Sequence, residues 1–464
     1  MPRKYFGTDG IRGEVGIEPL TDQFFIVLGV AIAKSLFKSS KLKKKIIFGL
    51  DTRKSCKKII NLISIGLISE GCEIHSAGIV PTPAIAFYTK QKNYDLGIMV
   101  SASHNLYKDN GIKIFDRNGF KISIDDENHI ENYIENIQNK HIRYEISETN
   151  IKNVSSNAQT EYINFCLDSF KINNVKMSLT LDLANGANYE LAPKIFQEAG
   201  FNINIYNNKP NGKNINDKCG STYLKDLPNT VKKDNSEFGI SMDGDGDRIV
   251  IVNSDGLVLD GDDILYIIIK GRKFLNESVE GVVGTTMTNC ALEHYLIKEN
   301  INFLRTKVGD KYVLEKMLTN NYILGGETSG HILMLDHSTS GDSIIAALQF
   351  LYYSDILIKN NKYDLLDKYP QKITNLSIDT DLPENIINII IKEANEKYLS
   401  NEMRIVIRRS GTESCIRIMV EAKTNDIVNN ASNDIKEFIK EKINILLWKK
   451  LLLQTGRIME IKSL

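Results

Sequence analysis

Two short polar stretches contain the side chains best suited to chemistry. Ser101-Ala-Ser-His-Asn105 follows the apolar run Gly97–Val100, and Asp243-Gly-Asp-Gly-Asp-Arg248 comes much later in the chain. A hydroxyl placed directly after a strand is held by the strand, and the following loop leaves its Oγ accessible. Three carboxylates at alternate positions repel one another unless a cation lies between them, and oxygen ligands suit Mg²⁺. A phosphorylated serine beside one Mg²⁺ per chain would carry out phosphoryl transfer.

Each stretch has a simpler interpretation. Ser-Ala-Ser-His-Asn could be a polar turn, and an Asp-Gly alternation is often a surface loop. A calcium loop of the EF-hand type is excluded, because Arg248 stands where its glycine is required and Ser254 where its glutamate is required. The runs Phe238–Met242 and Ile249–Val252 flank the aspartates. We therefore expect a tight turn between two strands, with glycines that let Asp243, Asp245 and Asp247 converge.

A glycine-rich segment, Gly325-Gly-Glu-Thr-Ser-Gly-His331, contains an acid, hydroxyls and an imidazole. A carboxylate at Glu327 and a hydroxyl at Ser329 could bind neighbouring sugar hydroxyls. The alternative is an ordinary glycine-rich turn in which His331 is structural.

A second loop, Arg408-Arg-Ser-Gly-Thr-Glu413, follows an alternating strand. An arginine fork with hydroxyls and backbone N–H groups suits phosphate, although the Walker spacing is absent. A basic, solvated turn is the alternative. Arg12, in the small-residue loop Phe6–Gly13, and Lys113, after Ser103 on the returning chain, are weaker candidates on their own.

Composition limits the class of protein. The 464 residues carry equal numbers of acidic and basic side chains, 58 each, which argues against general binding to nucleic acid or to an anionic membrane. The six cysteines are dispersed, as in a protein of the reducing cytosol. The N-terminus has no apolar signal sequence and no apolar run is long enough to span a bilayer. We expect a cytoplasmic protein.

Short Ile/Val-rich runs alternate with helical periodicity along most of the chain, which predicts α/β layers. The polar stretch 147–158 suggests a linker. Near the C-terminus, alternating segments predict an open antiparallel sheet with helices on one face. The apolar run Ile445–Leu453 predicts either the end of an amphipathic helix or a tail that docks a partner. The predicted domains are 1–152, 153–254, 255–368 and 369–464.

These stretches, taken in order, resemble the α-D-phosphohexomutase superfamily, and within it the branch that acts on glucosamine phosphates. The similarity extends to about residue 440 and rests on a set of short motifs: Arg3–Gly13, Asp51-Thr-Arg53, Ser101–Asn105, Asp109–Lys113, Asp243–Arg248, Val308-Gly-Asp310, Gly325–His331 and Arg408–Glu413. The resemblance implies three related α/β domains with mixed sheets and a smaller C-terminal α+β domain around a central cleft.

The resemblance also implies roles for single residues. Ser103 would be the phosphoserine and would hold Mg²⁺ together with Asp243, Asp245 and Asp247. The sugar and phosphate loops would bind substrate through this set: Glu327, Ser329, His331, Arg408, Ser410, Gly411 and Thr412. Proton transfer or charge stabilisation would fall to these candidates, which stay unranked: Arg12, His104, Lys113, Arg248 and His331.

The implied reaction interconverts glucosamine 6-phosphate and glucosamine 1-phosphate through a 1,6-bisphosphate, and feeds synthesis of UDP-N-acetylglucosamine and the cell wall. A homodimer and an activating kinase, or autophosphorylation, are possible partners in this scheme. The alternatives are a phosphomannomutase/phosphoglucomutase and a non-catalytic phosphosugar-binding protein. Five residues depart from the usual pattern without removing a reacting group: Leu106, Lys311, Ser343, Arg409 and Ser414.

Overall fold

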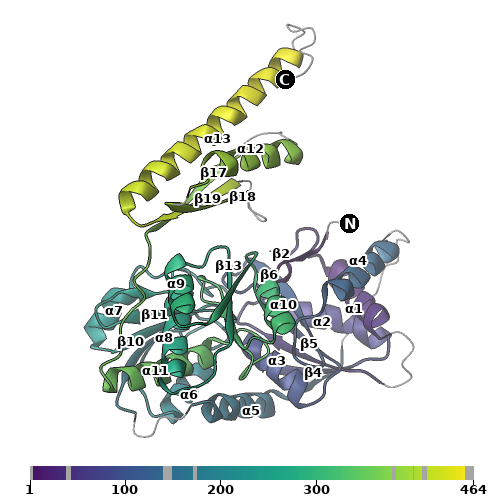
Figure 1. The fold of residues 1–464 in the computed structure, drawn as a ribbon. Helices are drawn as coiled ribbons and strands as arrows, with labels where there is room; N and C mark the ends of the chain where they lie inside the picture. The colour runs from purple at the N-terminus through teal and green to yellow at the C-terminus, as the bar shows by residue number, and fades with distance from the viewer. Residues whose placement is uncertain are drawn as a thin grey trace. The chain divides into compact units, whose positions relative to one another are not determined.

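The computed structural model describes residues 4–37, 43–138, 149–170, 175–378, 383–400, 402–409 and 415–454. These residues form two compact units. The first contains the chain up to Thr285 and residues 300–365, and the second contains Thr286–Glu299 and the chain from Leu366 onward. Figure 1 shows the elements in chain order, from purple at the N-terminus to yellow at the C-terminus.

The first sheet of unit one has seven strands and carries Ser103 at the end of a central strand. Across the sheet the order is β1 (Phe6–Gly7), β2 (Gly10–Glu14), β6 (Asp109–Asp116), β5 (Leu96–Val100), β3 (Lys45–Leu50), β4 (Glu73–Ile79) and β7 (Ile151–Asn153). The accompanying helices are α1 (Asp22–Leu36), α2 (Cys56–Ser69), α3 (Thr82–Gln91) and α4 (Ile124–Gln138). Every residue of β5 is buried, as in a strand covered on both faces.

The prediction that residues 147–158 form a linker is wrong for the residues of this stretch that the structure describes. Residues Ile151–Asn153 form β7, which pairs in parallel with β4, and α5 (Ser155–Asp168) begins directly afterwards. The side chain of Asn153 accepts a hydrogen bond from the N–H of Ser155. The stretch is polar because β7 is an edge strand with two exposed residues, so composition alone did not reveal its pairing.

Two further sheets in unit one each present a functional loop as a hairpin. The second sheet has the order β12 (Val258–Leu259), β11 (Ile249–Asn253), β10 (Phe238–Met242), β8 (Ser178–Asp182) and β9 (Asn202–Tyr206), with helices α5, α6 (Leu191–Glu198) and α7 (Leu227–Asp234). Strands β10 and β11 are antiparallel, and their last pair is Met242 with Ile249. The aspartates therefore occupy the hairpin turn, as predicted.

The third sheet has the order β14 (Asn302–Thr306), β13 (Gly281–Thr285), β15 (Leu324–Gly326) and β16 (Ile332–Met334). Its helices in unit one are α8 (Gly261–Phe274), α10 (Asp310–Asn320) and α11 (Ser343–Lys359). Strands β15 and β16 are antiparallel, with Gly326 opposite Ile332. The glycine-rich segment is therefore a short hairpin loop.

The second unit is an antiparallel sheet backed by helices. Its strands follow the order β17 (Gln371–Ser377), β19 (Cys415–Ala422) and β18 (Met403–Arg409), and its helices are α9 (Cys290–Lys298), α12 (Glu384–Lys397) and α13 (Asn425–Gln454). Apolar residues of α12 and α13 share one core with the sheet. The open antiparallel sheet is confirmed, and the apolar run Ile445–Leu453 belongs to the end of a helix.

The predicted fold class, α/β domains with mixed sheets and a smaller C-terminal α+β domain, is confirmed by these sheets. The boundaries at 152, 254 and 368 and the central cleft stay predictions. Among the described residues, no helix is both long and apolar enough to cross a membrane.

Helices α1 and α2 cross at a pair of glycines beneath the first sheet. A Cβ added at Gly66 would lie 2.1 Å from the carbonyl oxygen of Ile26, and one at Gly29 would lie 2.2 Å from that of Ile63. The obstructing atoms are helix backbone, which cannot rotate away. The two helices can approach this closely only because neither residue has a side chain.

We predict that Gly66→Ala destabilises unit one by about 1–2 kcal/mol, because overpacking against backbone outweighs alanine's better helix propensity. Thermal unfolding, with hydrogen exchange of α1 and α2, would measure the loss. Lys57→Ala, at an exposed position of the same helix, is the control and should leave the transition unchanged. Equal stability of Gly66→Ala and Lys57→Ala would contradict this account of the crossing.

Candidate active site

Ser103 lies just beyond β5 with a φ of +52°, a left-handed conformation that is uncommon for residues other than glycine. Its Oγ donates a hydrogen bond to Oδ2 of Asp243 at 2.5 Å, and its N–H donates to Oγ of Ser101 at 2.9 Å. Such strained backbone is typical of functional sites. The predicted proximity of Ser103 to the aspartate turn is thus present in the structure.

The predicted accessibility of the Ser103 hydroxyl is wrong for this conformation, since the residue is 0% exposed. The aspartate turn covers it closely. A Cβ added at Gly244 would lie 2.6 Å from the carbonyl oxygen of Ser103, so only glycine permits this approach. A phosphoryl group on Oγ must therefore displace the hydrogen bond between Ser103 and Asp243.

The three aspartates form a compact set of potential ligands. One ligand atom from each of Asp243, Asp245 and Asp247 lies within 4.8 Å of the others, and all three residues are buried. Among the described residues, Oδ1 of Asp245 and Oδ1 of Asp247 have no hydrogen-bond partner. Buried carboxylate oxygens without partners are costly, and an oxygen-rich set of this kind fits a hard divalent cation. Burial, and then the charges of Asp247 and Asp245, raise the pKa of Asp243 well above its usual range.

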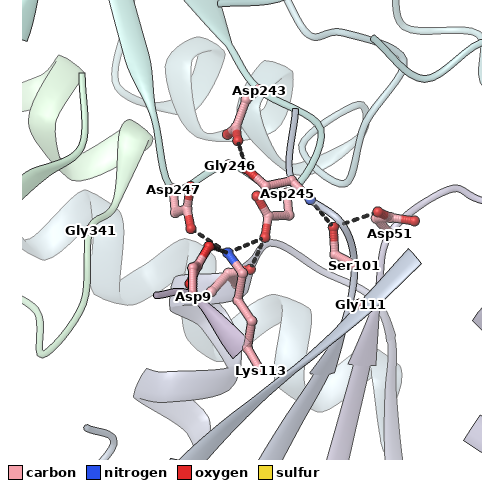
Figure 2. Close-up of polar contacts among 12 residues, drawn as sticks. Asp9, Asp51, Ser101, Gly111, Lys113, Asp243, Asp245, Gly246, Asp247 and Gly341 are labelled. Carbon is pink, nitrogen blue, oxygen red and sulfur yellow. Dashed lines mark hydrogen bonds and ion pairs between the residues drawn. The ribbon is translucent and has the colours of Figure 1, made fainter. Parts of the chain in front are cut away.

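The ammonium of Lys113 lies between carboxylates from two sheets, as Figure 2 shows. Its Nζ is 2.5 Å from Asp247 Oδ2, 2.8 Å from Asp245 Oδ2 and 3.2 Å from Asp9 Oδ2, and the residue is 1% exposed. Burial would lower the pKa of Lys113, but Asp245, Asp247 and Asp9 outweigh it and raise the pKa well above its usual range. Lys113 therefore stays protonated, and its ion pairs link the first sheet to the turn of the second.

Two residues of this cluster were not predicted from the sequence. Asp9 lies in the N-terminal loop that had drawn attention only to Arg12, and it forms ion pairs with Arg12, Lys113 and Lys121. Thr82 begins α3 and donates from Oγ1 to Asp245 Oδ2 at 2.5 Å. Asp9 could have been predicted, because it is an acidic residue in the same short loop as Arg12. No local sequence pattern marks Thr82.

Two of the proton-transfer candidates differ in charge. The ring of His104 has Nδ1 at 3.3 Å from Ser103 Oγ, and burial, followed by Arg248 and Arg12, lowers the pKa of His104 to about 4. His104 is therefore neutral near pH 7 and able to accept a proton. Burial would lower the pKa of Arg248, but Asp247 and Glu327 outweigh it, so this side chain remains a cation.

The glycine-rich hairpin lies directly against the aspartate turn. The N–H of Ile249 donates to the carbonyl of Gly330 at 3.0 Å, so the loop is fixed to the first residue of β11. Glu327 is buried and accepts from the N–H of Gly309 at 2.8 Å, and burial raises its pKa despite Arg248 and His331 nearby. Ser329 is exposed at the tip of the loop.

His331 lies between two carboxylates rather than at the loop surface. Its Nδ1 is 3.7 Å from Asp247 Oδ1 and its Nε2 is 3.5 Å from Asp310 Oδ2. Burial lowers its pKa, yet Asp310 and Asp247 raise it more, so the net shift is upward. Lys121 bridges Asp9 and Asp310, which extends the charged cluster to the third sheet.

In the second unit, Arg408 lies directly opposite Arg417 in the antiparallel pair of β18 and β19. Burial, and then the charge of Arg417, lower the pKa of Arg408. Like charges directly opposite in a sheet destabilise it, and a bound anion would relieve the repulsion. The predicted ligands Ser410, Gly411 and Thr412 lie outside the described residues.

Two residues that depart from the phosphohexomutase pattern make specific contacts. Ser343 begins α11 and donates from Oγ to the carbonyl of Gly246 at 2.8 Å. Lys311 forms an ion pair with Glu127 at 2.7 Å. Leu106 is exposed and only its carbonyl takes part in the site.

The chain is similar to known proteins along most of its length. The chain matches four family models described as phosphoglucomutase/phosphomannomutase: alpha/beta/alpha domain I over residues 3–141, domain II over 159–256, domain III over 260–369 and the C-terminal domain over 368–438.

Among solved structures, a phosphoglucomutase/phosphomannomutase family protein from Burkholderia thailandensis covers 94% of this chain and 97% of its own, with a TM-score of 0.76 and 19% identity. A putative phosphomannomutase from Thermus thermophilus covers 95% and 99%, with a TM-score of 0.74 and 16% identity. At these identities the likeness concerns the fold.

Sequence relatives are much more similar. The phosphoglucosamine mutase of Nitrosococcus oceani is 38% identical over 442 residues, which cover 94% of this chain and 97% of that protein. The phosphoglucosamine mutase of Neisseria meningitidis serogroup B is 39% identical over 429 residues, covering 92% and 96%. With its four matched domains and a Ser103–aspartate centre built from hairpins of adjacent sheets, the chain belongs to the phosphoglucosamine mutase family of the α-D-phosphohexomutases.

Proposed function

We propose that this protein is an intramolecular phosphotransferase that interconverts glucosamine 6-phosphate and glucosamine 1-phosphate. The observation that carries the proposal is the contact between Ser103 Oγ and Asp243 at 2.5 Å within a buried set of carboxylates. Near-full-length relatives named phosphoglucosamine mutase support the choice of substrate. The product would feed UDP-N-acetylglucosamine and cell-wall synthesis.

In the proposed reaction, Ser103 carries a phosphoryl group, placed there by a kinase or by autophosphorylation. The sugar hydroxyl attacks this phosphorus, the bond from phosphorus to Ser103 Oγ breaks, and a 1,6-bisphosphate forms. The sugar then turns over, and Ser103 Oγ takes back the other phosphoryl group. Each transfer conserves phosphate, so no external donor is consumed once Ser103 is loaded.

The aspartates would hold one Mg²⁺ through Asp243, Asp245 and Asp247, together with an oxygen at Ser103. When bound, the ion would neutralise charge on the transferring group. Oδ1 of Asp245 and Oδ1 of Asp247, which accept no hydrogen bond among the described residues, support this assignment. A fungal relative of the same fold, N-acetylphosphoglucosamine mutase from Aspergillus fumigatus, was solved with GlcNAc-6P and magnesium.

Charge and position suggest different roles for the remaining groups. His104 is neutral near pH 7 and close to Ser103 Oγ, so we assign it the exchange of the serine or sugar proton. Lys113, whose pKa the neighbouring carboxylates raise, would stabilise the aspartates and the transferring group. Arg12 and Arg248 supply positive charge beside them.

Substrate binding would be divided between two loops. Glu327 and Ser329 would bind sugar hydroxyls. His331, which lies near Asp247, would contribute positive charge next to these residues. Arg408, with Ser410, Gly411 and Thr412, would bind the phosphate that is not reacting. Such binding supplies positioning energy for the transfer.

We also propose a cytoplasmic enzyme, because all six cysteines are free thiols, as in proteins of a reducing compartment.

We predict that Ser103→Ala abolishes the phosphoenzyme and lowers kcat by roughly 10³-fold or more, since the group that carries the phosphate is gone. Intact-mass measurement and a coupled assay would test both effects. Ser69→Ala, at an exposed helix end, is the matched control and should keep both properties. Normal turnover in Ser103→Ala would refute the proposed phosphoserine.

For the metal, Asp245→Asn should weaken activation by Mg²⁺ at least about 10-fold, because one anionic ligand is lost. Mn²⁺ binding followed by electron paramagnetic resonance gives a readout that does not depend on turnover. Asp255→Asn, on an exposed turn, should bind the ion as the unaltered protein does. Full activity in excess chelator would exclude the magnesium site.

Substrate choice can be measured by comparing the 6-phosphates of glucosamine, glucose and mannose. We expect kcat/KM to be highest for glucosamine 6-phosphate. A preference for a neutral sugar would instead favour a phosphomannomutase/phosphoglucomutase, and no turnover of any of the three would favour a non-catalytic binding protein.

A further inference from the structure

A single buried arginine binds the whole loop that carries Ser103. The guanidinium of Arg53 donates to four backbone carbonyls of that loop, those of Ser103, Asn105, Leu106 and Asp109. Nη2 lies 2.9 Å from Ser103 O and 2.7 Å from Asn105 O, while Nη1 lies 2.5 Å from Leu106 O and 3.2 Å from Asp109 O. The arginine side chain is 0% exposed.

Asp51 fixes the orientation of this arginine. Its Oδ2 accepts from Arg53 Nε at 2.8 Å, and its Oδ1 accepts from the N–H of Arg53 at 2.8 Å. The same Oδ2 accepts from Ser101 Oγ at 2.6 Å, and Ser101 Oγ in turn accepts the N–H of Ser103. Figure 2 shows the contact between Asp51 and Ser101. Both the N–H and the carbonyl of Ser103 are therefore tied to one ion pair.

The backbone of Ser103 requires such support. A left-handed residue with a Cβ is strained and persists only where surrounding contacts enforce it. A relaxed backbone would re-aim Oγ, which now lies 2.5 Å from Asp243. Asn216 adds one donor to the same carbonyls of Ser103 and Asn105, at 2.8 Å and 2.9 Å. Arg53 is the larger source of support, with contacts to four of the loop carbonyls.

We propose that Arg53 is a positioning residue for phosphoryl transfer: oriented by Asp51, it keeps the Ser103 loop in the conformation that aims Oγ at the carboxylate set. Its nitrogens are directed to Asp51 and to backbone carbonyls, so it acts on the reaction only through Ser103. This proposal rests on the proposed role of Ser103 as the phosphate carrier.

The first test compares Arg53→Lys with Arg272→Lys. Lysine keeps the positive charge, but its single ammonium group cannot donate to all the carbonyls that the planar guanidinium fork reaches. We expect kcat to fall about 100-fold in Arg53→Lys, as for a reacting group displaced by roughly 1 Å, with KM for glucosamine 6-phosphate little changed. Arg272 is equally buried and pairs with Asp336 at 2.7 Å, away from the loop, so Arg272→Lys should lose only thermal stability.

A second test uses chemical rescue. Guanidinium chloride, well below denaturing concentrations, should restore part of kcat in Arg53→Ala, and methylammonium chloride should not, because only guanidinium has the planar fork. Where Arg53→Ala does not fold, the lysine variant alone decides. A kcat for Arg53→Lys equal to that of Arg272→Lys, or a loss seen only in KM, would overturn the proposal.

Phosphoenzyme measured in the same samples separates the two hypotheses. Wild-type protein that never carries phosphate on Ser103 would remove the proposed function itself. A second outcome would contradict only the role of Arg53. In it the wild-type protein carries phosphate on Ser103, and Arg53→Lys transfers that phosphate at the wild-type rate in a single turnover. Slow transfer from a normally phosphorylated Arg53→Lys supports both.

Discussion

Burial of several like charges beside one serine is the constraint on which the first unit depends. Asp245 and Asp247 are removed from water together, and they are compensated by the ammonium of Lys113, itself 1% exposed. Breaking a buried charge pair by removal of one partner costs about 3–5 kcal/mol. The lysine comes from the first sheet and the aspartates from the second, so the site forms only where these two sheets pack together.

The same burial explains why the serine is not open to solvent. Ser103 and Asp243 contact each other directly, and the backbone at Gly244 covers the serine carbonyl. A phosphorylated serine must separate these two side chains, so the phosphorylated and unphosphorylated proteins differ at this point. A site that excludes water also protects a phosphoserine from hydrolysis, as expected of a mutase rather than a phosphatase.

Local sequence signals predicted the parts of the site that depend on neighbouring residues. The apolar strand before Ser103, the turn that bears Asp243 to Asp247 and the glycine-rich loop all appear where expected. Roles that come from distant contacts were not predicted. Thr82 reaches its aspartate across 163 positions, and Arg53, quoted only within a family motif, reaches the serine loop across about 50. Polar composition was misleading for the edge strand β7, which was interpreted as a linker. The position of Ser103 after a strand suggested an accessible hydroxyl, but a turn from another sheet covers it.

The central claim is that one phosphoryl group travels through Ser103, and isotopic labelling tests it most directly. Enzyme loaded from a ³²P-labelled 1,6-bisphosphate, then mixed with unlabelled glucosamine 6-phosphate in a rapid-quench experiment, should carry label on the peptide containing Ser103. That label should pass to the sugar at least as fast as kcat. Label on another residue, or transfer slower than turnover, would contradict the account.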